Sequence, residues 1–139
     1  MIDQELLARV QRRLGNTPMM ATLSQSLVEI SAGRVVISAE PHPHFENAMA
    51  RMHGGFVAAL IDTALGWCVA TKLNGEVGHG TVDLNVKFVR KIDMATGTIF
   101  ATAQIVHAGR TMLTAEAKVA DASGKLYAHG SGTFLVYAQ

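Results

Sequence analysis

One stretch of the sequence, residues 55–73, is apolar on nearly every side, and it constrains the fold more than any other feature. Its length predicts an α-helix rather than a strand. Because a helix without a broad polar face must be buried, the rest of the chain is expected to wrap around it. Asn74 and Gly75 are expected to end this helix.

The remaining residues predict one more helix and a set of strands joined by short turns. Residues 3–14 have the spacing of an amphipathic helix, which Gly15, Asn16 and Pro18 are expected to stop. Strands joined by hairpin turns favour a mostly antiparallel sheet, so the predicted fold class is α+β, in one domain spanning residues 1–139. The predicted strands are 22–30, 34–40, 81–90, 98–107, 112–120 and 126–137, with a turn at 31–33 and a loop at 41–55.

Composition excludes several broad classes of function. The 139 residues are 49% hydrophobic and carry a net charge of +1, which argues against a general nucleic-acid binder but allows a local basic patch. The single cysteine, Cys68, permits no internal disulfide and suits the cytoplasm. The first residues lack the pattern of a signal peptide, and the apolar run 56–70 is too short to span a bilayer, so no membrane association is expected.

Asp62 is a carboxylate in the middle of the apolar helix. No Lys or Arg lies within one turn on either side of it, so a local salt bridge cannot explain it. A charge in apolar surroundings is costly unless another group pairs with it or uses it. Asp62 is therefore expected to have a partner from elsewhere or a catalytic role.

The sequence His53-Gly54-Gly55 comes directly before this helix. It could be a simple turn, or Gly54 or Gly55 could present a backbone N–H to an oxygen that gains negative charge, aided by the helix dipole. Here the His-Gly-Gly sequence is followed by Asp62, nine residues after the His, on one apolar helix. This combination indicates a functional site more specifically than either part alone.

Two more polar residues flank this helix and have two interpretations each. Asn47 either forms a turn or orients a water or a carboxylate. Thr81 either favours its strand or positions a nucleophile with its hydroxyl.

A metal site is not predicted. His42 and His44 lie close in sequence, and His53 and His79 could join them, but no carboxylate or cysteine falls at a familiar ligand spacing. Cys68 lies in the apolar helix beside Trp67, where a buried thiol is usually inert.

Basic residues gather near the end of the strand predicted at 81–90, and another lies at a turn. Lys87, Arg90 and Lys91 form the first group, and Arg110 is the isolated residue. They are either a solvated surface or a clamp for the phosphates of a nucleotide-bearing ligand.

Three segments taken together resemble the hotdog-fold acyl-CoA thioesterases of the phenylacetic-acid-pathway (PaaI) type. They are NAMARMHGGFVAALIDTALG, GTVDLNVKFVRKI and IVHAGRTMLTAEAKVADASGKLYAHGSGTFLVY, and the resemblance covers roughly residues 20–137. It implies a hotdog fold, in which a curved antiparallel sheet wraps a long helix. It also implies a double-hotdog homodimer, often assembled into a homotetramer, with each active site at the dimer interface.

The resemblance also implies roles for individual residues. Asp62 matches the catalytic carboxylate, either general base or nucleophile, and Gly54 matches the glycine whose N–H polarises the thioester carbonyl. Asn47 and His53 match supporting positions, and Thr81 matches a residue that helps to hold the water. The residues expected near the coenzyme A substrate are Gly55, Arg90, Lys91 and Arg110. The implied reaction gives a free carboxylic acid and coenzyme A, and needs no cofactor.

Other functions remain open on the sequence. A hotdog hydroxyacyl-thioester dehydratase is one, and a hotdog protein that binds acyl-CoA without turnover is another. The acyl group itself is not identified. Five apolar residues could line its pocket, but helix positions among them are equally well explained as core: Phe45, Met49, Met52, Phe56 and Leu60.

Overall fold

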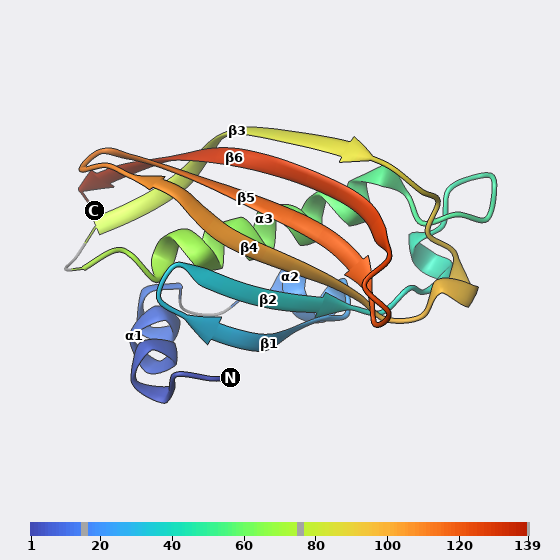
Figure 1. The fold of residues 1–139 in the computed structure, drawn as a ribbon, viewed down its shortest axis with the longest axis horizontal. Helices are drawn as coiled ribbons and strands as arrows, with labels where there is room; N and C mark the ends of the chain where they lie inside the picture. The colour runs from blue at the N-terminus through green and yellow to red at the C-terminus, as the bar shows by residue number, and fades with distance from the viewer. Residues whose placement is uncertain (15–16, 75–76, 139) are drawn as a thin grey trace.

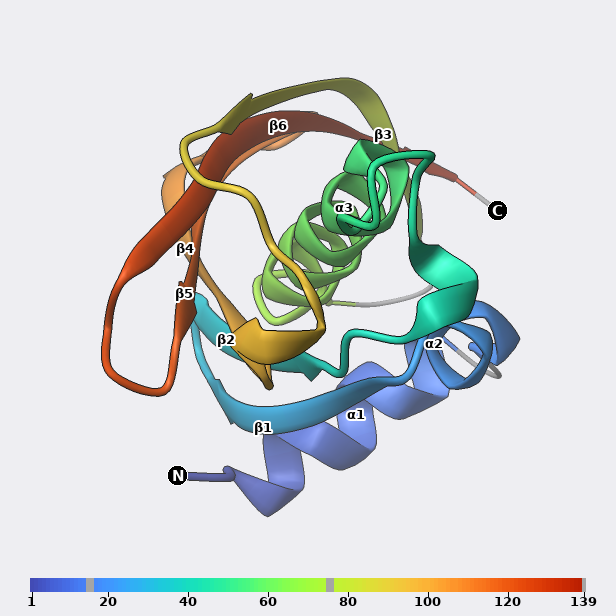
Figure 2. The same ribbon diagram turned by 90° about the vertical axis from the view of Figure 1, so that its right-hand side faces the viewer.

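The computed structural model describes residues 1–14, 17–74 and 77–138. One curved six-stranded antiparallel sheet wraps around a central helix, α3 (Gly54–Ala70), as Figure 1 and the end-on view in Figure 2 show. The predicted α+β architecture, with a long helix enclosed by a sheet, is thereby confirmed. Among the described residues, no helix is long and apolar enough to cross a membrane.

The sheet has the order β1-β2-β4-β5-β6-β3, so β3 crosses to the far edge after α3. Alternation sets the inner face, as in β5, where Leu113, Ala115, Ala117 and Val119 are buried against the helix. Gly33, at a φ of 77°, forms the predicted turn between the first two strands. The strands are β1 (Gln25–Ser31), β2 (Arg34–Ala39), β3 (Val77–Phe88), β4 (Ile99–Ala108), β5 (Met112–Asp121) and β6 (Leu126–Ala138).

The helix α3 packs most of its surface into the core, but one stripe stays half-exposed. Leu60, Ile61, Ala64 and Leu65 are fully buried, whereas the stripe that includes Asp62, Thr63 and Gly66 is only partly covered. The helix ends at Ala70, earlier than predicted. Just beyond this end, Arg9 donates hydrogen bonds to the carbonyl oxygens of Thr71 and Leu73. Gly75, part of the predicted stop, lies outside the described residues.

The N-terminal segment differs from the prediction in one respect. The first helix, α1 (Gln4–Leu14), is confirmed, but a second short helix, α2 (Pro18–Thr22), follows where a stop was expected. Pro18 occupies the first turn, where its fixed φ and missing N–H favour a helix start. The first strand therefore begins at Gln25 rather than at residue 22. Gly15 and Asn16 lie outside the described residues.

The edge strand β3 is unlike the other long strands because it is exposed on both faces from Thr81 to Asn85. Within the described chain it pairs only with β6. Its apolar residues remain open, with Val82 56% and Phe88 57% exposed. A long apolar edge with unpaired backbone groups favours addition of another strand.

Candidate active site

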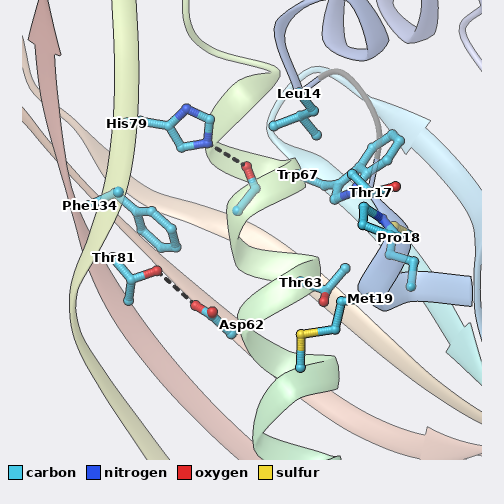
Figure 3. A pocket seen from close by; sticks show the side chains of 13 residues that line it. Leu14, Thr17, Pro18, Met19, Asp62, Thr63, Trp67, His79, Thr81 and Phe134 are labelled. Carbon is cyan, nitrogen blue, oxygen red and sulfur yellow. Dashed lines mark hydrogen bonds between the residues drawn. The ribbon is translucent and has the colours of Figure 1, made fainter. Parts of the chain in front are cut away.

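Asp62 finds its partner on the edge strand rather than on its own helix. The Thr81 hydroxyl donates a hydrogen bond to Asp62 Oδ1 over 2.8 Å, as Figure 3 shows. No Lys or Arg in the described part of the chain forms an ion pair with this carboxylate. Asp62 thus has a polar partner outside its own helix, and that partner is a hydroxyl of the same chain.

A cavity of about 340 Å³ opens beside Asp62. It runs across the half-exposed stripe of α3, between β3 on one side and the α1–α2 segment on the other (Figure 3). Its described lining is mostly apolar or small: Leu14, Thr17, Pro18, Met19, Met20, Asp62, Thr63, Gly66, Trp67, His79, Gly80, Thr81 and Phe134.

His79 forms one wall of this cavity and approaches the helix backbone. Its Nε2 lies 3.3 Å from the carbonyl oxygen of Gly66. Burial lowers the pKa of His79 below the ordinary value, the Gly66 hydrogen bond opposes this shift, and Arg13 adds to it. The neutral ring is therefore favoured at neutral pH, which keeps this wall uncharged.

The His-Gly-Gly sequence forms the start of α3 and leaves one donor free. His53 caps the helix, and its Nδ1 accepts the N–H of Gly55 over 2.7 Å. The Gly55 N–H is thus already used by His53, so in this structure it cannot also donate a hydrogen bond to a ligand. The Gly54 N–H has no acceptor among the described residues. It is therefore an unpaired hydrogen-bond donor at the N-terminus of α3.

Asn47 organises the loop that precedes this helix. Its Oδ1 accepts the N–H groups of Met49 and Arg51 over 2.9 and 3.3 Å, which is the geometry of a local turn. Asn47 also lines a cavity with Gly54. The turn-forming interpretation is therefore observed, and Asn47 also lines the same cavity as Gly54.

This second cavity, of about 300 Å³, lies at the N-terminus of α3 and is more polar than the first. Gly54, Arg90 and Lys91 are on its wall. Arg90 is anchored by a 2.7 Å hydrogen bond to the Leu126 carbonyl, and Lys91 lies 3.6 Å from an Asp93 oxygen. A neighbouring cavity shares Arg90, Lys91 and Tyr127 and adds Lys125, so a basic track leads outward from Gly54. Lys87 of the same sequence cluster donates instead to Asn85.

Arg110 does not join this basic group within one chain. It follows β4 next to Thr111, whose carbonyl accepts the N–H of Val136, whereas the N–H of Arg90 reaches Tyr127. Tyr127 and Val136 are nine residues apart on β6, or about 30 Å at the rise of a strand. Within one chain, Arg110 and Arg90 therefore lie near opposite ends of β6.

Asp62 and Gly54 also do not meet within one chain. They are eight residues apart on α3, which is about 12 Å along the helix axis. Each lines a different cavity. One protomer thus holds a carboxylate site and an N–H donor site that cannot contact the same carbonyl group.

Five residues considered for an acyl pocket mostly belong elsewhere. Met52, Phe56 and Leu60 are buried in the core, and Phe45 stacks on Phe56 with ring centroids 4.7 Å apart. Met49 is 68% exposed on the loop. The cavity beside Asp62 instead uses Met19, Met20, Trp67 and Phe134, none of which was singled out as a site residue. The sequence signal that could have indicated Met19 and Met20 is Pro18, which can begin a helix and is followed directly by these apolar residues.

The remaining candidate groups are the possible metal ligands and the single cysteine. Within the described residues, no group of three or more His, Cys, Asp or Glu is arranged to hold a metal ion. Cys68 is buried and donates to the Gly33 carbonyl over 3.3 Å, and its burial raises the pKa of the thiol to about 12. This thiol is therefore inert at neutral pH.

Comparison with known proteins identifies relatives of this chain. The family model described as the thioesterase superfamily matches residues 49–128. A Halobacterium salinarum protein classed provisionally as an esterase is 32% identical, over 94% of this chain and 91% of the relative. Human acyl-coenzyme A thioesterase 13 is 26% identical, over 78% of this chain and 76% of the relative.

Solved structures share the fold. A thioesterase family protein of Silicibacter pomeroyi superposes with a TM-score of 0.88 at 23% identity, covering 96% of this chain and 99% of that one. The Escherichia coli PaaI protein superposes with a TM-score of 0.85 at 18% identity, covering 97% and 95%. The hotdog fold predicted from the sequence is confirmed by these similarities.

Proposed function

Because this chain belongs to the thioesterase superfamily and is a thioester hydrolase, we propose that it hydrolyses acyl-CoA, with Asp62 and Gly54 at the reacting centre. The observation that carries this proposal is the division of two complementary groups between two cavities. Asp62 lies beside an apolar cavity, and the open Gly54 N–H lies at the start of a basic track. These match the acyl group and the nucleotide of an acyl-CoA.

The active site is proposed to form between two copies of the chain. Asp62 is bonded to Thr81, and Gly54 lies against Phe88, whose ring would be 3.2 Å from a Cβ added there. If two β3 edges pair antiparallel about Leu84 and Asn85, Thr81 of one copy lies opposite Phe88 of the other. The carboxylate of one copy then approaches the N–H donor of its partner.

In the proposed reaction, the thioester carbonyl oxygen accepts the Gly54 N–H. This donor and the helix dipole stabilise the negative charge that develops on the oxygen. Asp62 acts in one of two ways. As a general base it takes a proton from a water that attacks the carbonyl carbon. As a nucleophile it forms an anhydride that water then opens. In both cases the C–S bond breaks and coenzyme A leaves.

Supporting residues are proposed to hold these groups. Thr81 occupies one oxygen of Asp62 and leaves the other for water or substrate. His53 and Asn47 fix the helix start and its loop, which sets the direction of the Gly54 N–H. Gly55 contributes by letting the His53 cap approach closely, since a Cβ there would lie 2.9 Å from Nδ1.

Arg90 and Lys91 are proposed to bind the phosphates of coenzyme A. In the antiparallel pair, the end of the sheet that carries Arg110 in one copy lies alongside the end that carries Arg90 in the other. Arg110 would therefore reach a coenzyme A only from the second copy. A homodimer is the smallest assembly that this proposal requires, and a tetramer would contain two such pairs.

The test is release of coenzyme A from acyl-CoA by wild-type protein and by Asp62→Asn. We expect Asp62→Asn to lower kcat by about 10²-fold or more while the thermal unfolding curve is retained. Glu116→Gln, an exposed carboxylate on β5, is the matched control and should be as active as wild type. Near-normal turnover by Asp62→Asn would overturn the assignment. Binding without release would favour a non-catalytic acyl-CoA-binding protein, and hydration of crotonyl-CoA would favour a dehydratase.

A further inference from the structure

The cavity beside Asp62 has a feature that the proposed reaction does not require, namely a roof supplied by the N-terminal segment. Leu14 ends α1, and Pro18, Met19 and Met20 belong to α2. Figure 3 shows Thr17, Pro18 and Met19 facing α3 across the cavity from His79 and Thr81. The roof therefore depends on the short helix that follows Pro18.

The chemistry of this cavity suits an uncharged, apolar occupant. Among the described residues that line it, Asp62 is the only carboxylate and His79 the only other titratable group. Trp67 and Phe134 supply aromatic surface, and Met19 supplies a flexible thioether that adapts to the shape of a ligand. A polar ligand would find few partners away from Asp62 and Thr81.

The dimensions of the cavity limit its occupant. Its volume, about 340 Å³, is near the lower end of ligand pockets. Asp62 and Trp67 are five residues apart on α3, which is about 7.5 Å along the axis. A carbon chain with bonds of about 1.5 Å covers this length with roughly six carbons.

We propose that this cavity binds the acyl group, that the roof of α2 and the Trp67 side chain limit it to a compact acyl group, and that Gly66 sets its depth. This inference rests on the proposed acyl-CoA hydrolysis. The substrate class is a medium-length or single-ring acyl thioester. Acetyl groups leave most of the cavity unfilled, and the part of a long chain beyond about six carbons gains no further contact with it.

Gly66 is a suitable position for the test because a side chain there enters the cavity at little structural cost. A Cβ at Gly66 would meet only Phe134 Cε1, at an ordinary contact distance of 3.9 Å. Ala and Leu also favour a helix more than Gly does. Gly66→Ala therefore adds a methyl group without a forced clash, and Gly66→Leu extends the side chain further.

The experiment compares kcat/KM for acetyl-, hexanoyl-, benzoyl- and palmitoyl-CoA. For wild type, kcat/KM should rise from acetyl to hexanoyl and not rise further at palmitoyl. Gly66→Leu should lower the ratio of hexanoyl to acetyl activity by roughly tenfold or more, with Gly66→Ala between it and wild type. Ala8→Leu, which adds the same side chain at an exposed position of α1, should leave the ratio unchanged.

Three results would contradict the proposal, and they differ in what they overturn. If Gly66→Leu lowers acetyl and hexanoyl activity equally, or if palmitoyl-CoA is the best wild-type substrate, the acyl assignment of this cavity is wrong while acyl-CoA hydrolysis stands. If wild type releases no coenzyme A from any of these thioesters, the proposed function itself fails.

Discussion

Thr81 on the edge strand donates its hydroxyl hydrogen to Oδ1 of Asp62 on the central helix over 2.8 Å. This contact fixes a carboxylate that has no ion-pair partner in the described chain. It also links the carboxylate to the strand most exposed for pairing with a second copy. The orientation of Asp62 and the proposed pairing of two copies thus depend on the same strand.

Thr81→Val is expected to lower kcat by about 10–100-fold, because a hydrogen bond to a charged group contributes about 1.5–3 kcal/mol. Valine keeps the branched shape and the strand preference of threonine, so folding should be unaffected. Thr81→Ser retains the hydroxyl and should restore most of kcat with little change in KM. Steady-state hydrolysis of hexanoyl-CoA measures both values. Equal loss in the serine and valine variants would indicate a packing role instead.

Gly54→Pro should abolish most turnover because it removes the one open N–H at the helix start. Proline is favoured at the first position of a helix, and the ψ of 140° at His53 suits a residue before proline. The expected loss is about 10²–10³ in kcat, the usual effect of deleting an oxyanion donor.

Gly54→Ala is the matched control for this prediction. It introduces a similar contact with the Phe88 ring, 3.2 Å from the added Cβ, but retains the N–H. The alanine and proline variants therefore share the contact with Phe88 and differ in the N–H, so the alanine variant should keep substantially more activity than the proline variant. Equal inactivation of both variants would show that the effect is steric.

Arg90→Ala combined with Lys91→Ala should raise KM for acyl-CoA several-fold, since an exposed ion pair contributes about 1 kcal/mol at most. The same variant should hydrolyse an acyl-pantetheine, which lacks the nucleotide, as wild type does. Added salt should weaken acyl-CoA binding by wild type more than by the variant. Lys118→Ala, on β5, is the charge-matched control. An equal change in KM for both thioesters would contradict phosphate binding.

His79 should make the stability depend on pH. Burial lowers its pKa in the folded protein, so the unfolded chain binds more protons as the pH falls below the ordinary value of about 6.5. The free energy of unfolding should therefore be at its full value above that pH and decrease below it. His79→Gln should lose less stability than wild type between pH 7.5 and 5.5 in urea titrations. Parallel losses in both proteins would contradict this account.

Patterns that arise from burial could be predicted from the sequence. The apolar surface of residues 55–73 and the strands joined by hairpin turns correctly indicated a sheet wrapped around a helix, because burial selects the apolar residues of that helix directly. The short helix α2 was missed because Pro18 can begin a helix as well as end one. The exposure of β3 could not be predicted, because strand order depends on tertiary pairing, which the sequence pattern of one strand does not report.

The site could be predicted in part for the same physical reasons. Asp62 was singled out because a lone carboxylate in an apolar helix is costly, and Gly54 or Gly55 because a helix start has open donors. The choice of Gly54 over Gly55 came from the family resemblance. The separation of Asp62 and Gly54 into two cavities and the distance of Arg110 from Arg90 could not be predicted. Both follow from the direction of α3 and the length of β6 rather than from spacing in the sequence.

The most direct test of the two-chain active site is complementation between Asp62→Asn and Gly54→Pro chains. Each variant alone should be inactive, because every site in its homodimer contains the lesion. In a mixed dimer one site has both lesions and the other has none, so randomly mixed chains should regain about a quarter of wild-type activity. Refolding equal amounts of the two variants together and measuring hexanoyl-CoA hydrolysis decides the question. Restored activity is the predicted result, and a mixed sample of folded dimers as inactive as its components would contradict a site shared between two chains.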